Sequence, residues 1–70
     1  MQALSKAKAG ESYTIKWMFG AKEVLDFLHS RKVEEGSRIY VFDRMKNYVI
    51  IRSQGTKFVL GMDAAERIQV

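Results

Sequence analysis

The chain has 70 residues, of which 47% are hydrophobic and 29% charged, and its net charge is +4. This length predicts one small domain, spanning residues 1–70, and the composition is typical of a folded rather than a disordered protein. The absence of cysteine excludes disulfides and a thiolate zinc site. The apolar runs are far shorter than the roughly 20 residues of a membrane helix, and the N-terminus lacks a signal-peptide core, so we expect a cytoplasmic protein.

The first predicted elements are a strand and a helix. After a turn near Gly10, residues 11–18 alternate Tyr13, Ile15 and Trp17 with polar residues, which predicts a half-buried strand. Residues 21–31 then show the helical period, and a helix this short must pack against the rest of the domain. Its predicted apolar stripe consists of Ala21, Val24, Leu25 and Leu28, with Phe27 and His29 on the two flanks.

Three strands are predicted next, over residues 38–43, 47–53 and 56–60, because β-branched and aromatic residues dominate there. Both connections are short enough for hairpins. For the second hairpin we expect a type I turn followed by Gly55 in the left-handed conformation. A two-residue loop of Gln54 and Gly55 is less favourable, because glutamine disfavours positive φ.

The chain then leaves the sheet for a short turn over residues 62–66, which Asp63 is placed to cap. Residues 67–70 return to a strand pattern, and we expect them to pair with the first strand. The order of elements predicts an α+β or small-barrel fold, in which closure of the sheet removes exposed strand edges.

These residues resemble the FeoA family over nearly the whole chain. Val33, Gly36, Ile39 and Val41 are similar to the family's segment after the helix. Lys32 and Glu35 depart from it, since the family usually has glycine and proline there, and the connection between the second and third strands is shorter than usual. The beginning and the end of the chain carry the rest of the resemblance, through Leu4, Gly10, Glu11, Ile15, Leu60, Gly61, Ala65, Glu66, Ile68 and Val70.

The resemblance implies a mainly β fold, a small five-stranded SH3-like barrel. One α-helix would lie between strands one and two, and a short helical turn would precede strand five. It also implies a non-enzymatic accessory protein of bacterial ferrous iron uptake. Such a protein would act in the cytoplasm, at the inner face of the membrane, by binding the cytoplasmic part of a FeoB-like membrane transporter.

The C-terminal SH3-like domain of DtxR-type metal-dependent repressors has the same architecture. Those proteins carry a DNA-binding helix-turn-helix domain before it. Because this chain starts at a methionine and leaves no room for such a domain, we favour a stand-alone protein.

Metal binding and catalysis have little support in the sequence, and we expect no metal site, no cofactor and no enzyme activity. His29 is the one histidine, so tight transition-metal binding would depend on carboxylates. Glu34 and Glu35 point apart in an extended chain, and Glu23 and Asp26 lie on the polar face of the helix. The five glycines stand singly, so no phosphate-binding loop is present.

Single-stranded nucleic acid is the alternative ligand, since small barrels stack bases on surface aromatic residues within a basic groove. The twelve Lys and Arg residues are spread along the chain, however, and we expect the aromatic residues to lie in the core or under the helix. The candidates are Tyr40, Phe42, Tyr48 and Phe58, with Arg38, Arg44, Arg52 and Lys57 near them.

The favoured site is a protein-binding surface at the end of the helix. Phe27 is a large apolar residue beside two cations, Arg31 and Lys32, at an exposed end of the helix. The alternative is that Phe27 simply packs under the barrel. We refer to Phe27, Arg31 and Lys32 as the helix-end surface.

Overall fold

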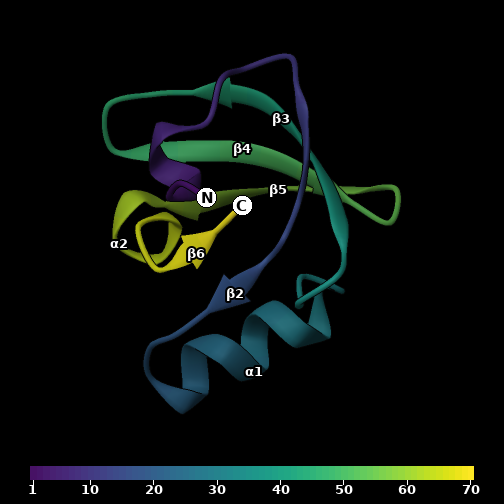
Figure 1. Ribbon diagram of the computed structural model, residues 1–70, viewed down its shortest axis with the longest axis vertical. Helices are drawn as coiled ribbons and strands as arrows, with labels where there is room; N and C mark the ends of the chain where they lie inside the picture. The colour runs from purple at the N-terminus through teal and green to yellow at the C-terminus, as the bar shows by residue number, and fades with distance from the viewer.

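The computed structural model describes residues 1–70 and contains six strands and three short helices (Figure 1). In chain order these are the 3-10 helix η1 (Leu4–Lys6), β1 (Ser12–Thr14), β2 (Trp17–Met18), α1 (Lys22–Ser30), β3 (Arg38–Arg44), β4 (Tyr48–Ser53), β5 (Thr56–Gly61), α2 (Met62–Ala65) and β6 (Ile68–Gln69).

The larger sheet has four antiparallel strands in the order β1-β3-β4-β5. Its last three strands match the predicted meander to within one residue at each end. Ile39 and Val41 point into the core, whereas Tyr40 and Phe42 point to the outer face. The register shifts between Val41 and Asp43, where β3 bulges against β4.

The predicted first strand is two strands in the structure. β1 pairs with β3, and β2 pairs with β6 in a separate two-stranded sheet. Between them, the Ile15 N–H donates to the Ser37 carbonyl at 2.8 Å and the Lys16 N–H donates to the Gln69 carbonyl at 2.8 Å. This change of partner reverses the alternation, so Met18 is buried and Trp17 is exposed, contrary to the predicted pattern.

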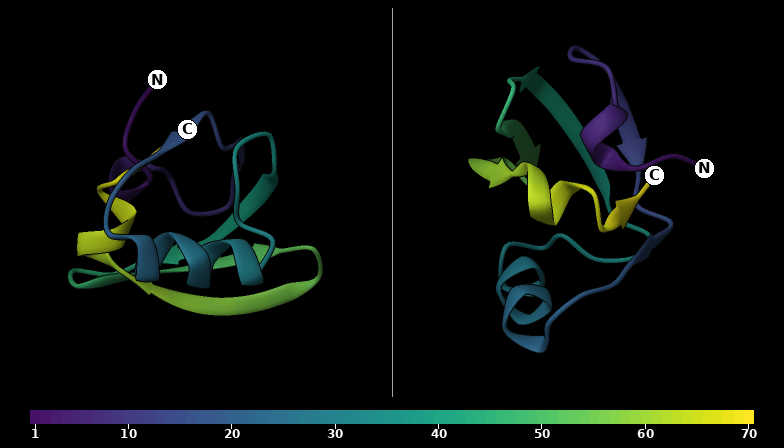
Figure 2. Two further views of the ribbon diagram at one scale, coloured as in Figure 1. Left: turned by 90° about the horizontal axis from the view of Figure 1, so that it is seen from below. Right: turned by 90° about the vertical axis from the view of Figure 1, so that its left-hand side faces the viewer.

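The end of the chain pairs with β2, as predicted, and also with the N-terminal segment. The Gln2 and Val70 N–H groups donate to each other's carbonyls at 2.9 and 2.8 Å, and Ala3 forms a bridge with Gln69. The two termini therefore lie side by side (Figures 1 and 2). The strands form two sheets without closing into a five-stranded barrel, although the mainly β arrangement is consistent with an SH3-like fold.

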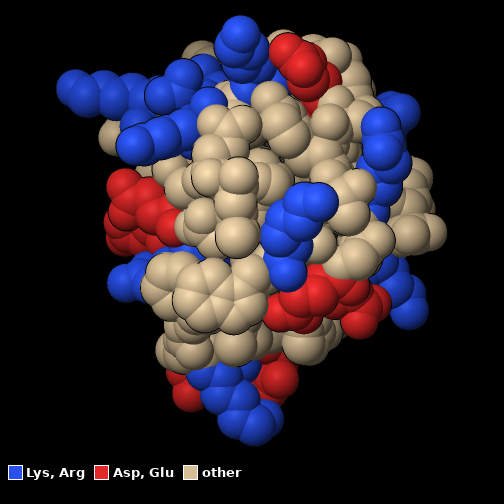
Figure 3. Space-filling view, in the orientation of Figure 1, with Lys and Arg blue, Asp and Glu red and all other residues tan.

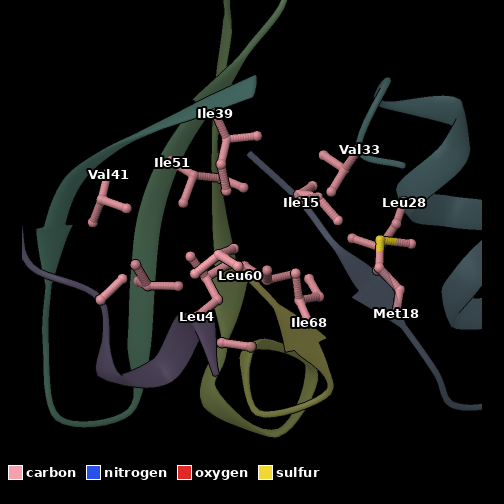
Figure 4. Packing of buried hydrophobic residues seen from close by; sticks show 14 residues of the cluster. Leu4, Ile15, Met18, Leu28, Val33, Ile39, Val41, Ile51, Leu60 and Ile68 are labelled. Atoms are coloured by element: carbon pink, nitrogen blue, oxygen red, sulfur yellow. The ribbon is translucent and has the colours of Figure 1, made fainter. Parts of the chain in front are cut away.

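One hydrophobic core joins all these elements (Figure 4). Val41 and Ile51 come from the large sheet, Leu4 from η1, and Leu28 from α1. The complete set of buried apolar residues is Leu4, Ala7, Ile15, Met18, Leu28, Val33, Ile39, Val41, Val49, Ile51, Leu60, Ala65, Ile68 and Val70.

Helix α1 buries less of its predicted apolar stripe than the sequence pattern indicates. Leu28 is buried and Leu25 is half-buried, but Ala21 and Val24 are exposed. The inward face is therefore narrow, and the helix presents apolar side chains to solvent. This exposure bears directly on the candidate site.

The C-terminus of α1 forms a Schellman motif. The Val33 N–H donates to the Leu28 carbonyl at 2.9 Å, and the Lys32 N–H donates to the His29 carbonyl at 3.0 Å. Lys32 has φ +65°, the left-handed conformation that glycine adopts at low cost. The position where the resembled family usually has glycine is thus the position where this helix end requires a left-handed residue.

The loop between β4 and β5 has two residues, and the predicted three-residue form is wrong. Ser53 pairs with Thr56, and both Gln54 (φ +53°) and Gly55 (φ +80°) are left-handed, as a type I′ turn requires. Ser53 is buried, and its hydroxyl donates to the Lys32 carbonyl at 3.0 Å. Burial of Ser53 and this hydrogen bond favour the register in which Ser53 pairs with Thr56, and that register requires positive φ at Gln54.

The predicted cap of α2 is also wrong. Gly61 occupies the N-cap position without a side-chain hydrogen bond, and Asp63 is the second residue of the helix. A capping side chain must precede the first helical residue, so Asp63 stands too late in the chain.

Replacing Lys32 with glycine should stabilise the fold, because a residue with a Cβ atom costs roughly 1 kcal/mol in the left-handed conformation. We expect Lys32→Gly to raise the free energy of unfolding in urea by about 1 kcal/mol. Lys32→Ala removes the same charge but retains the Cβ atom, so it should leave the stability almost unchanged. Equal effects of the two substitutions would contradict the assignment of strain to the backbone.

Closure by the last strand can be tested at Ile68, which is buried at the junction of β6 and the core. Truncation leaves a cavity, so Ile68→Ala should lower the free energy of unfolding by about 2–5 kcal/mol. The half-buried neighbour Gln69 provides the control, and Gln69→Ala should cost much less. A small effect at Ile68 in a denaturant titration would show that the tail is not part of the folded core.

Candidate partner-binding surface

Two of the three predicted site residues meet in a stacked cluster. The guanidinium carbon of Arg31 lies 5.1 Å from the ring centroid of Phe27 and 5.9 Å from that of Phe58 on β5. The two rings are in T-shaped contact, with centroids 6.4 Å apart. Phe27 therefore packs against the sheet on one side, yet 44% of it remains exposed. An anchored, partly exposed aromatic residue is suited to binding a partner with little loss of side-chain freedom.

Lys32 adjoins this cluster without stacking on it. It is exposed, and its backbone is held by the Schellman motif and by Ser53. A shallow polar hollow lies beside it, lined by Ser30, Arg31, Lys32, Ser53, Gln54 and Thr56. The helix-end surface thus combines an aromatic ring with two cations and no carboxylate among its three residues.

A second apolar feature, which the sequence analysis did not predict, is a cleft between the start of α1 and α2. Its volume is about 460 Å³. Val24, which is 41% exposed, lines it, and Phe27 lies one turn further along α1. The signal in the sequence is the wide apolar stripe of the helix, of which Ala21 and Val24 are exposed. The residues that line it are Phe19, Gly20, Ala21, Val24, Leu28, Asp63, Ala64 and Arg67.

An exposed aromatic pair extends the apolar surface from the cleft onto β2. The rings of Trp17 and Phe19 have centroids 5.0 Å apart, and Trp17 is 54% exposed. In Figure 3, uncharged atoms form an area down the middle of the face that carries β2 and β6, with both acidic and basic side chains around it. Apolar surface framed by charge is characteristic of interaction sites.

The acidic residues considered as metal ligands are not brought together. No group of three or more His, Asp or Glu side chains is placed to hold a metal ion. The Asp26 carboxylate accepts a hydrogen bond from the Lys22 ammonium group at 2.7 Å. Glu23, Glu34 and Glu35 are exposed, as is His29.

The aromatic residues of the nucleic-acid hypothesis fall on both sides of the sheet. The expectation that they are covered is wrong for Phe42 and Tyr48, which are exposed on the outer face, because the aliphatic residues of the same strands occupy the core. Phe58 is half-buried on the inner side, against Phe27. The four candidates therefore do not form one stacking platform.

A family model described as the FeoA domain matches residues 2–70. The chain belongs to the FeoA family. Membership supports a role in ferrous iron transport, as the resemblance implied. The resembled positions have structural roles: Leu60, Ala65, Ile68 and Val70 are all buried. No curated protein sequence matches the chain.

Solved structures show the same fold. A crystal structure of the iron uptake regulatory protein FeoA has a TM-score of 0.86 and 24% identity, over 94% of this chain and 89% of that one. A manganese-dependent transcriptional repressor has a TM-score of 0.87 and 20% identity, over 96% of this chain and 39% of the repressor. A crystal structure of ScaR with bound Zn²⁺ has a TM-score of 0.82 and 18% identity, over 97% of this chain and 35% of the ScaR chain. None of the helices in this structure has the length and apolar character needed to span a membrane.

The exposure of Trp17 provides a direct test of the apolar surface on β2. We expect the fluorescence of this one tryptophan to resemble that of tryptophan in water and to be strongly quenched by acrylamide, because more than half of the residue is exposed. Blue-shifted emission that resists quenching would instead support the simple alternation that the sequence predicted.

Proposed function

We propose that this protein is a non-enzymatic accessory protein of ferrous iron uptake, which acts by binding the cytoplasmic part of a FeoB-like membrane transporter. Family membership supports the role in iron transport. The observation that carries the binding proposal is the partial exposure of Phe27, which is held between Phe58 on β5 and Arg31.

The helix-end surface and the neighbouring cleft together form a docking face along α1. Val24, Phe27 and Arg31 follow one another at spacings of three and four residues, so they lie on one side of the helix. Val24 opens into the cleft, and Phe27 and Arg31 contact β5. A partner could bury the apolar residues and leave the cations at the rim, which is the usual arrangement of a protein interface.

The same residues offer no catalytic arrangement. His29 makes no side-chain hydrogen bond, and no serine hydroxyl is bonded to a histidine or a carboxylate. The serine hydroxyls that are bonded donate to backbone carbonyls, Ser30 to Phe27 and Ser53 to Lys32. We therefore assign helix α1 a binding role rather than a chemical one.

The double substitution Phe27→Ala, Arg31→Ala tests this surface. Removal of a central aromatic anchor and its stacked cation commonly costs 2 kcal/mol or more, so we expect affinity for the cytoplasmic part of a FeoB-like transporter to fall by about tenfold or more. The measurement is isothermal titration calorimetry with the purified transporter fragment, alongside circular dichroism to establish that the variant is folded.

The matched control is Met45→Ala, Lys46→Ala, which removes an exposed apolar residue and a cation from the β3–β4 connection. This variant should bind as the unaltered protein does. Unchanged affinity in the folded Phe27, Arg31 variant would exclude the helix-end surface. Absence of binding by the unaltered protein would exclude the proposed partner itself.

A further inference from the structure

The outer face of the four-stranded sheet carries two cations that converge on one aromatic ring. The Arg52 guanidinium carbon lies 5.0 Å from the centroid of Phe42, and the Lys57 ammonium nitrogen lies 4.6 Å from it. Tyr40 packs on the same ring in a T-shaped arrangement, at 5.1 Å. The strand register explains this meeting, because Tyr40, Arg52 and Lys57 stand directly opposite one another on β3, β4 and β5.

This cluster lacks a balancing anion. Like charges directly opposite each other on adjacent strands destabilise a sheet, and Arg52 and Lys57 are such a pair. The molecule contains a single salt bridge, between Lys22 and Asp26, so neither cation has a carboxylate partner. Attraction to the ring of Phe42 compensates the repulsion between Arg52 and Lys57 only in part. An anion from a bound ligand would offset the remaining repulsion.

Apolar surface adjoins the cations in the next row of the sheet. Val59 is 59% exposed, and Phe42 is 36% exposed. Ile50, half-buried, is the register partner of Val59 and of Asp43. Asp43 is the nearby carboxylate in this row, and its side chain accepts a hydrogen bond from the Arg44 N–H at 2.8 Å. A ligand that is both anionic and apolar would complement the two cations and the apolar residues beside them.

No other part of the protein covers the outer face. Figure 2 (left) shows α1 and the two-stranded sheet on one side of β4 and β5, and the other side of these strands is open. β5 is also an edge strand of its sheet, so its unpaired backbone groups lie beside the cluster and are available to an extended peptide.

We propose that this face binds an acidic, apolar peptide segment of a partner protein, with carboxylates at Arg52 and Lys57 and an apolar side chain on Val59 and Ile50. Two observations favour a peptide over single-stranded nucleic acid. The ring of Phe42 is already occupied by two cations and by Tyr40, so a base cannot stack there without displacing one of them. The open edge of β5 matches the hydrogen-bonding groups of a peptide backbone. The net positive charge of the face opposes its use between two copies of this chain.

The probe is a ten-residue peptide that alternates glutamate with leucine, labelled with fluorescein and titrated with the full chain by anisotropy. We expect binding at low salt that weakens as the salt concentration rises, because the cations are exposed. The glutamine analogue of the peptide should bind far more weakly. The neutral variant Arg52→Gln, Lys57→Gln should lose about fivefold to tenfold in affinity for the acidic peptide.

Two further variants separate this site from the general positive charge of the protein. Lys16→Gln, Lys46→Gln removes two exposed cations from outside the face and should retain affinity. The reversal Arg52→Glu, Lys57→Glu should reject the acidic peptide and bind its lysine counterpart. This exchange of preference is a readout that a merely structural role of the two cations would not produce.

Four results would overturn the proposal. The first is failure of the acidic peptide to bind, and the second is equal binding of the peptide to the neutral variant. The third is tighter binding of an oligothymidylate than of the peptide, which would assign the face to nucleic acid. The fourth is a change of oligomeric state in the reversal variant by analytical ultracentrifugation, which would assign the face to a second copy of the chain. The transporter-binding experiment depends on Phe27 and Arg31, so its result is independent of the peptide-binding results at Arg52 and Lys57.

Discussion

The antiparallel pairing of the two chain ends is the contact on which the rest of the structure depends. β6 lies between β2 and the N-terminal segment, with hydrogen bonds to Lys16 on one side and Gln2 on the other. Ile68 of β6 and Val70, which follows that strand, belong to the same core as Leu4. In a chain of 70 residues, where little apolar surface is available, the core is complete only when these terminal residues are in place. α2 serves that closure by reversing the chain between β5 and β6.

The same closure determines how α1 is held. The chain must pass from β1, in one sheet, to β2, in the other, before it enters the helix. α1 then reaches the core chiefly through Leu28, and Val33 in the Schellman motif adds a second apolar contact beyond the helix end. A helix anchored along such a narrow line has exposed apolar residues on either side of it. The candidate docking face is therefore a consequence of how the small core is closed.

The sequence predicted the elements whose signals are local. β-Branched and aromatic content identified β3, β4 and β5, because each of those strands contributes apolar residues to the core: Ile39 and Val41, Val49 and Ile51, and Leu60. Prediction from the sequence failed where tertiary contacts override the local conformational preference. The phase of alternation between Ile15 and Trp17 changes because the backbone changes partners there, and the residues themselves carry no mark of this. Gln54 adopts positive φ because the pairing of Ser53 with Thr56 leaves a two-residue loop, and its type I′ turn requires positive φ at both residues.

The same division between local signals and tertiary contacts applies to the candidate sites. The sequence could place Phe27 beside Arg31, since residues four apart share a helix face, and the structure adds Phe58 as their common support. It could not pair Arg52 with Lys57 across a hairpin whose loop length was misjudged, because a shift of one residue would have sent one of the two to the opposite face. The two-residue loop between β4 and β5 thus does more than connect strands. By setting the register, it brings two like charges onto one ring, and it creates the chemical feature that distinguishes the outer face of the sheet from an ordinary solvated surface.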